Sequence, residues 1–277
     1  MRTSLARRGT VVWMTIALAV TVGCSSQRET SNEAIERLAR AYDAVKDVHL
    51  ETAASMAMVI HGEQLTRTDT SEVWLRRDGE VLLYRVETKN VQRVPWPGFA
   101  LSEITTEAVM VIDGEFSWLT AADPMFGKWA TKDRVGNAKS PGSDAAAMGL
   151  MNGLHVDLRE RVRKTAATCT LEKIGRGTVL GRSTTIIETT LSEDEVLMLP
   201  VGERRSTPVR SVMHFDDTSG FPLAVQAYTL DGTKMMDLKP VKFQLNGGVS
   251  RKLFTFTPPE DYRIIDKTKD EAEKKSP

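Results

Sequence analysis

The sequence predicts a mainly β protein in which one strongly curved antiparallel sheet carries a few helices on one face. Many short runs after residue 48 alternate apolar and polar side chains, which is the pattern of half-buried strands. Two Asp-Gly pairs, at 78–79 and 113–114, each stand between two such runs, and this dipeptide is the strongest short-range signal of a β-hairpin. One amphipathic stretch before the first strand predicts a helix.

The N-terminal segment has the features of a signal peptide over residues 1–23. A basic stretch, MRTSLARRGT, precedes the uncharged VVWMTIALAVTV, which is too short to span a bilayer comfortably and suits the core of a signal peptide. The next residues, TVGC, resemble the bacterial lipobox, which implies cleavage after Gly23, a diacylated Cys24 and a lipidated tether over 24–30. An ordinary secretory signal or an uncleaved anchor is the alternative. Ser25 implies the outer membrane under the enterobacterial sorting pattern.

Composition bounds the rest of the chain. The 277 residues have zero formal net charge, and the first 23 contain three arginines and no acid, so the remainder is slightly acidic. This balance gives no reason to expect nucleic acid as a partner. With Cys24 lipidated, Cys169 would be the only other thiol, so no intrachain disulfide is expected. Its alternating surroundings, ATCTLEKI, predict a buried structural cysteine in a strand.

The mature domain is predicted to open with a helix and a long strand. Residues 30–48 place Thr30 and Glu33 at capping-box spacing and repeat apolar groups at helical spacing, at Ile35, Leu38, Tyr42 and Val45. Residues 49–63 then alternate like a strand with a methionine-rich face. The two hairpins follow this strand.

A less regular segment interrupts the strands in the middle of the chain. Residues 137–154 begin as a loop and continue as a short Ala/Met/Leu helix, and a second short helix is predicted over 156–165. A polar insert covers 192–207, and the charged tail 267–277 is predicted to be disordered. The predicted order is one helix, four strands, a helical insert and about six more strands.

The C-terminal half contains short motifs in a recurring order. A D…TG.P hairpin, a strand pair, an asparagine and a terminal F.F.PP.…VID are matched here at Asp216 to Pro222, Asn246, Phe254, Phe256, Pro258, Pro259 and Ile265 to Asp266. In this the chain resembles the LolA/LolB-type lipoprotein-sorting factors and their lipid-binding relatives. The resemblance implies one domain over 31–266 that forms an unclosed antiparallel β-barrel of about eleven strands. Helices would plug its concave face, and a cavity would accept acyl chains.

The family is functionally broad, with soluble carriers, anchored acceptors, glycolipid carriers and stress sensors, so the resemblance predicts fold more directly than function. One hypothesis is an anchored periplasmic lipoprotein that binds acyl chains of lipids or lipoproteins and takes cargo from a soluble periplasmic carrier. The alternative is an envelope sensor or scaffold that uses the same fold to bind a protein partner. A covalent anchor at Cys24 disfavours a soluble-carrier role.

No catalytic motif is recognisable in the sequence. There is no Gly-x-Ser-x-Gly, no phosphate-binding glycine-rich loop and no metal-spaced histidine pair, because the four histidines stand in separate segments, at His49, His61, His155 and His214. Asp157 near His155 is interpreted as part of a surface or capping pair, and Asp216 with Asp217 as the start of a turn. We therefore expect no enzyme activity, no cofactor and no metal.

Methionine is the sequence's main indication of a ligand cavity. Its side chain adapts to irregular apolar ligands, although it also fills ordinary cores, so both interpretations stay open. The side chains that we expect to line the cavity are Met56, Met58, Trp74, Leu83, Met110, Met148 and Met151.

The loop over residues 91–106 places large apolar groups where two prolines and a glycine exclude regular structure. These groups are Trp96, Phe99 and Leu101, between the third and the fourth predicted strands. In the anchored LolB-type acceptors, a loop between the same strands carries an exposed apolar residue that serves cargo transfer, and the match here is one of position. The loop is predicted to be either a membrane- or cargo-contacting tip or a static plug over the cavity mouth.

Overall fold

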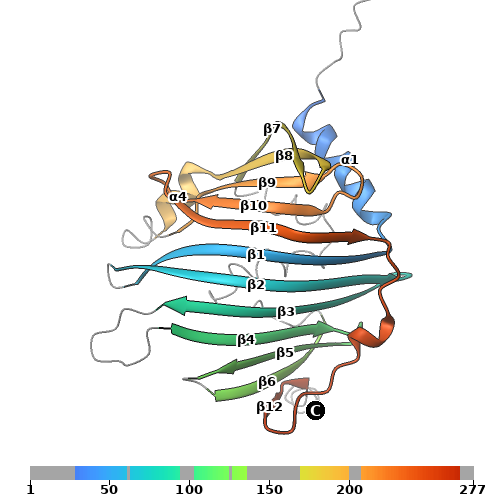
Figure 1. The fold of residues 1–277 in the computed structure, drawn as a ribbon. Helices are drawn as coiled ribbons and strands as arrows, with labels where there is room; N and C mark the ends of the chain where they lie inside the picture. Colours follow the sequence, from blue (N-terminus) through green and yellow to red (C-terminus); the bar gives the residue numbers. More distant parts are fainter. Residues whose placement is uncertain are drawn as a thin grey trace, which may run out of the picture.

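The computed structural model describes residues 29–60, 63–93, 103–124, 127–135, 169–199 and 207–268. These residues form one twelve-stranded sheet in the order β12-β6-β5-β4-β3-β2-β1-β11-β10-β9-β8-β7 (Figure 1). Neighbouring strands are antiparallel, except that β12 runs parallel to β6. The two end strands, β12 and β7, do not pair with each other, so the sheet is unclosed. The predicted fold class, a mainly β half-barrel with few helices, is confirmed.

The central strands β1 and β2 are the longest, with 14 and 16 residues. The strands are β1 (Asp47–Ile60), β2 (Glu63–Asp78), β3 (Val81–Arg93), β4 (Glu103–Ile112), β5 (Phe116–Asp123), β6 (Gly127–Arg134), β7 (Cys169–Val179), β8 (Arg182–Leu191), β9 (Arg210–Asp216), β10 (Pro222–Tyr228), β11 (Lys234–Leu245) and β12 (Arg263–Asp266). The helices are α1 (Ser31–Asp43), α4 (Glu193–Met198) and the 3-10 helix η2 (Arg251–Phe254).

The first helix begins where its capping box predicts. The backbone N–H of Thr30 donates to the Glu33 carboxylate (2.7 Å), and the Thr30 hydroxyl accepts from the backbone N–H of Glu33 (3.3 Å). The helix ends at Asp43, earlier than predicted, and Val48 already lies in β1, between Leu75 of β2 and Leu245 of β11. The last residues of the stretch predicted as helix therefore belong to the sheet, because strand pairing there outweighs the local helical pattern.

Two other features differ from the predicted order. Among the described residues six strands precede residue 136, where the predicted order has four. One strand that was not predicted is β6, because its largely polar run lacks the apolar alternation by which a strand is recognised. The polar insert 192–207 contains the short helix α4, whose first turn is capped by Ser192 accepting from the backbone N–H of Glu195. This Ser-x-x-Glu spacing is the same capping signal that identified the first helix.

The two faces of the sheet are covered by different parts of the chain. On one, called here the α1 face, strand register aligns Val48, Leu75 and Tyr84, and the helix residues Leu38 and Tyr42 complete the same buried cluster. On the other, called the C-terminal face, a second cluster joins Leu83 and Val111 of the sheet to Val249 and Phe254 of the segment after β11. The chain therefore covers both faces of its sheet, each from one end of the sequence.

Several predictions lie outside the described residues. These are the signal peptide 1–23, the lipidation site Cys24, the two helices predicted over 137–154 and 156–165, and the tail beyond residue 268. Within the described part of the chain, no helix has the length and apolar character needed to cross a bilayer.

Candidate functional site

The α1 face carries another apolar cluster, which lies away from the helix. We call it the Met patch, and its residues are Ala54, Met56, Val225, Ala227, Met236 and Leu238. Register pairs Met56 with Met236 directly across β1 and β11. The buried cluster under the helix, which contains Val48, is called here the α1 cluster. Ala54 is six residues beyond Val48, so the Met patch begins about 20 Å farther along β1. No described residue of α1 belongs to it.

Polar side chains continue from the Met patch across the same face onto β2 to β5. Strand register aligns Asp69 with Asn90 and Asn90 with Thr106. The hydroxyl of Thr106 donates to the carboxylate of Asp123 on β5 (3.1 Å). We call these four residues the polar row. The α1 face beyond the helix thus carries the apolar Met patch on β1, β10 and β11 and, beside it, the polar row on β2 to β5, which makes it amphipathic.

Asp69 is the most enclosed member of the polar row, with 3 % of its surface exposed. Its Oδ1 accepts from Nε of Arg67 (2.7 Å), whereas its Oδ2 and the Oδ1 of Asn90 are buried atoms that have no hydrogen-bond partner within the described part of the chain. Burial raises the pKa of the Asp69 carboxyl, although Arg67 opposes this. Unpartnered buried acceptors are costly, so this position favours a group that can donate hydrogen bonds.

The predicted cavity residues do not share one face. Met56 lies in the Met patch and Met110 lies in the α1 cluster, both on the α1 face. Trp74 and Leu83 pack with the C-terminal segment on the opposite face, so they do not share a cavity with Met56 and Met110, and their role as cavity residues stays a prediction. Trp74 stands opposite His49, one position away from the pair that faces α1, and a one-residue error exchanges the two faces of a strand.

The remaining cavity predictions are not tested by the described side chains. The backbone of Met58 lies in β1 opposite Leu65, but its side chain is outside the described part, as are Met148 and Met151. Cys169 begins β7, as the strand prediction requires, but its side chain is only half-buried.

The loop with the apolar triplet connects β3 and β4, as predicted. Its residues Trp96, Phe99 and Leu101 lie outside the described residues, so the choice between a tip and a plug stays a prediction. Its two attachment points, Arg93 and Glu103, pair at the end of the sheet away from α1 (Figure 1). This is also the end at which the Met patch lies.

The motif residues of the C-terminal half have structural roles. Asn246, with a positive φ of 52°, accepts from the backbone N–H groups of Lys46 and Asp47, which joins the end of β11 to the start of β1. Phe254 is buried beside Leu83 on the C-terminal face. These motifs therefore build the framework around the candidate site and do not line it.

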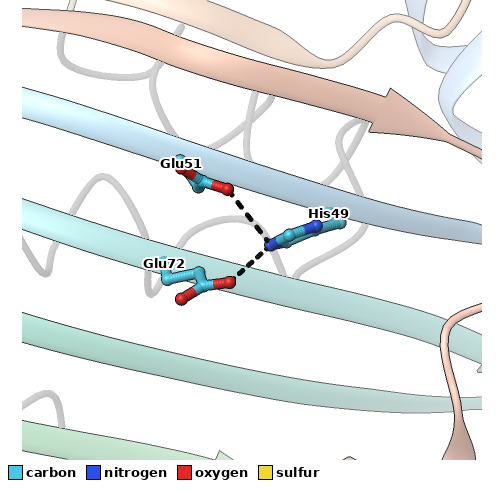
Figure 2. A group of neighbouring side chains, drawn as sticks. All are labelled: His49, Glu51 and Glu72. Carbon is cyan, nitrogen blue, oxygen red and sulfur yellow. Dashed lines mark hydrogen bonds and ion pairs between the residues drawn. The ribbon is translucent and has the colours of Figure 1, made fainter.

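The C-terminal face carries a polar cluster that was not predicted from the sequence. Figure 2 shows the carboxylates of Glu51 on β1 and Glu72 on β2 pointing toward a ring nitrogen of His49 on β1. Nε2 of His49 lies 2.7 Å from Oε1 of Glu72 and 4.0 Å from Oε1 of Glu51. The i, i+2 spacing of His49 and Glu51 was a visible signal, but Glu72 joins them only through strand register.

The sequence matches no family model and no curated protein. Among solved structures, that of MucB is 14 % identical with a TM-score of 0.47, and the match covers 85 % of this chain and 65 % of that one. This chain therefore spans less than two thirds of the length of MucB. A conserved protein from Thermus thermophilus is 11 % identical with a TM-score of 0.46, covering 86 % of this chain and 99 % of that one.

A LolA superfamily protein from Nitrosomonas europaea is 11 % identical with a TM-score of 0.28, over 82 % of this chain and 98 % of that one. This is the family that the C-terminal motifs resemble. The open half-barrel is the architecture expected from that resemblance. At these identities and TM-scores the likeness concerns architecture and says nothing about what the protein binds.

Proposed function

We propose that this protein is a lipid-anchored lipoprotein of the cell envelope that binds acyl chains of a lipid or an acylated lipoprotein and acts in their transfer or sorting. The observation that carries the proposal is the Met patch, a buried apolar cluster on the α1 face of an open sheet, at the end away from α1. Two of its six residues are methionines, which adapt to a mobile chain. Binding, not catalysis, is the activity proposed.

The arrangement also fits the amphipathic character of such a ligand. Eight methylenes laid against the Met patch would contribute about 6 kcal/mol before the costs of association are subtracted. The polar row lies beside the patch, and its unpartnered acceptors on Asp69 and Asn90 suit the donor-bearing end of the ligand. An acyl chain and a polar group would then lie on neighbouring halves of one face.

The acyl site is tested by replacing the facing pair Met56 and Met236 with glutamine. The change keeps side-chain length but places two amides in an apolar site, so it should weaken binding of the probe 11-(dansylamino)undecanoic acid at least tenfold. The measurement is a fluorescence titration of the anchor-free Cys24→Ser chain. Met110→Gln is the matched control, because Met110 is equally buried on the same face but belongs to the α1 cluster. Equal affinities in all three proteins, or no binding by the parent, would overturn the proposal.

We infer that Cys24 holds the anchor, on the periplasmic side of the outer membrane. Glu29 is fixed to the domain by Arg37 (2.8 Å) and Lys173 (2.7 Å), which leaves residues 25–28 as the span to the bilayer. Four residues reach at most about 14 Å, so the edge of the sheet at β7 would stay close to the membrane.

Replacing Cys24 with serine should either leave the precursor unprocessed or move the protein from the membrane pellet to the soluble fraction, because acyl chains hold an anchored lipoprotein at the bilayer. Mass spectrometry of the mature wild-type N-terminus provides the second measurement. An unmodified N-terminus at another residue would show that the anchor assignment is incorrect.

A further inference from the structure

The cluster on the C-terminal face has the ligand set of a metal site. We propose that His49, Glu51 and Glu72 bind a divalent transition-metal ion, with Zn²⁺ as the best match. Nε2 of the histidine and one oxygen of each carboxylate all lie within 4.8 Å of one another. Imidazole nitrogen favours Zn²⁺ over Mg²⁺ or Ca²⁺, and three protein ligands with one open position are a common zinc arrangement.

The backbone places these three side chains together with little freedom. His49 and Glu51 are two residues apart on β1 and therefore share a face, and Glu72 is the direct cross-strand partner of Glu51. Both strands are central in the sheet, with β11 and β3 as their outer neighbours. A metal at this position would be held by rigid elements.

The imidazole is already oriented for coordination. The ring of Trp74, the cross-strand partner of His49, stacks on it with centroids 5.4 Å apart and ring planes within 5°. This contact leaves Nε2 directed at the two carboxylates (Figure 2). An ion with bonds of about 2.1 Å needs tetrahedral ligand atoms about 3.4 Å apart. Shifts of less than about 1.5 Å in the two carboxylates, which are 36 % and 41 % exposed, would reach that geometry.

The charges along this part of the sheet favour a cation. Glu51, Glu72 and Glu87 stand directly opposite one another on β1, β2 and β3, and like charges at such positions are destabilising. Arg85 pairs with Glu87 (2.6 Å), and Lys242 pairs with Glu51 (2.9 Å). A metal ion bound to His49 would lie between the carboxylates of Glu51 and Glu72 and would reduce the repulsion between them.

Lys242 makes the proposal sharper, because its ammonium competes with the metal for Glu51. The Lys242 side chain is 54 % exposed and can move into solvent when a metal ion binds. It then opposes metal binding in two ways, through repulsion between its ammonium group and the metal ion and through the loss of its ion pair with Glu51. Removing it should therefore tighten metal binding. A metal that binds elsewhere on the surface would not respond to this change.

The test is a calorimetric titration of the full chain with ZnCl₂ in neutral buffer, because metal affinity depends on pH. The parent is expected to bind one zinc ion per chain. In His49→Gln and in Glu72→Gln the affinity for this ion should fall at least tenfold. Lys242→Ala should bind zinc several-fold more tightly, and Glu87→Gln should stay within about twofold of the parent. MgCl₂ should give no comparable binding.

The melting temperature of each variant without zinc shows whether the fold is retained, and the addition of zinc should raise it only in proteins that keep the three ligands. A stoichiometry that does not fall in His49→Gln would overturn the proposal. So would a zinc affinity that Lys242→Ala leaves unchanged or weakens.

Discussion

Replacing Gly220 with alanine should destabilise the domain by about 3 kcal/mol or more. Gly220 has a positive φ of 66°, and a Cβ atom there would overlap the carbonyl oxygen of Leu38 in α1. The same atom would lie 2.9 Å from the carbonyl carbon of Leu38 and 3.0 Å from the backbone nitrogen of Tyr42. Backbone atoms of a helix cannot move aside as a side chain can, so α1 would have to shift away from the turn that contains Gly220.

Gly232→Ala is the matched control for this prediction. Gly232 also has a positive φ, of 83°, but a Cβ atom at this position meets nothing within 4 Å. Its cost should be the backbone strain alone, about 1 kcal/mol. Urea unfolding followed by tryptophan fluorescence measures both variants. Similar losses in the two proteins would mean that α1 does not depend on close approach at Gly220.

The parts of the fold that were predictable depend on neighbouring residues. The capping box at Thr30 and Glu33 starts α1, and the Asp-Gly pairs at 78–79 and 113–114 lie in the turns between β2 and β3 and between β4 and β5. Each signal acts over a few residues and needs no information about the rest of the chain. The same is true of Ser192, whose capping spacing was present in the sequence but hidden by its polar surroundings.

The parts that were not predictable depend on register between distant strands. Alternation shows that Trp74 belongs to a strand, but which face it occupies is settled only by its pairing with His49 and by the C-terminal segment that packs against it. Likewise, Asp69 and Asn90 become neighbours only when β2 and β3 pair. The candidate site is made of such cross-strand neighbours, so the sequence indicated its apolar character and Met56 but not the residues that strand pairing brings beside it.

The turn that contains Gly220 and packs against α1 also contains a buried carboxylate. Asp216 is fully buried, and Arg182 donates to both of its oxygens, from Nε to Oδ1 (2.8 Å) and from Nη2 to Oδ2 (2.9 Å). The backbone N–H and the hydroxyl of Ser219 also donate to Oδ2. Burial favours the neutral acid, but these hydrogen bonds outweigh it, so the pKa of Asp216 lies below its ordinary value of 3.8.

Asp216→Ala should therefore cost about 3 kcal/mol at neutral pH, because it removes the partner of Arg182 and the acceptor that holds the turn. The folded-state pKa is lowered, so the carboxylate's contribution is present above pH 3.8 and lost as the pH falls through the folded-state value. The stability difference between parent and variant should narrow over that range in urea unfolding. Lys128→Ala provides the contrast, since its ion pair with Asp261 is exposed and should contribute little. Equal losses in the two variants would contradict a structural role for the buried pair.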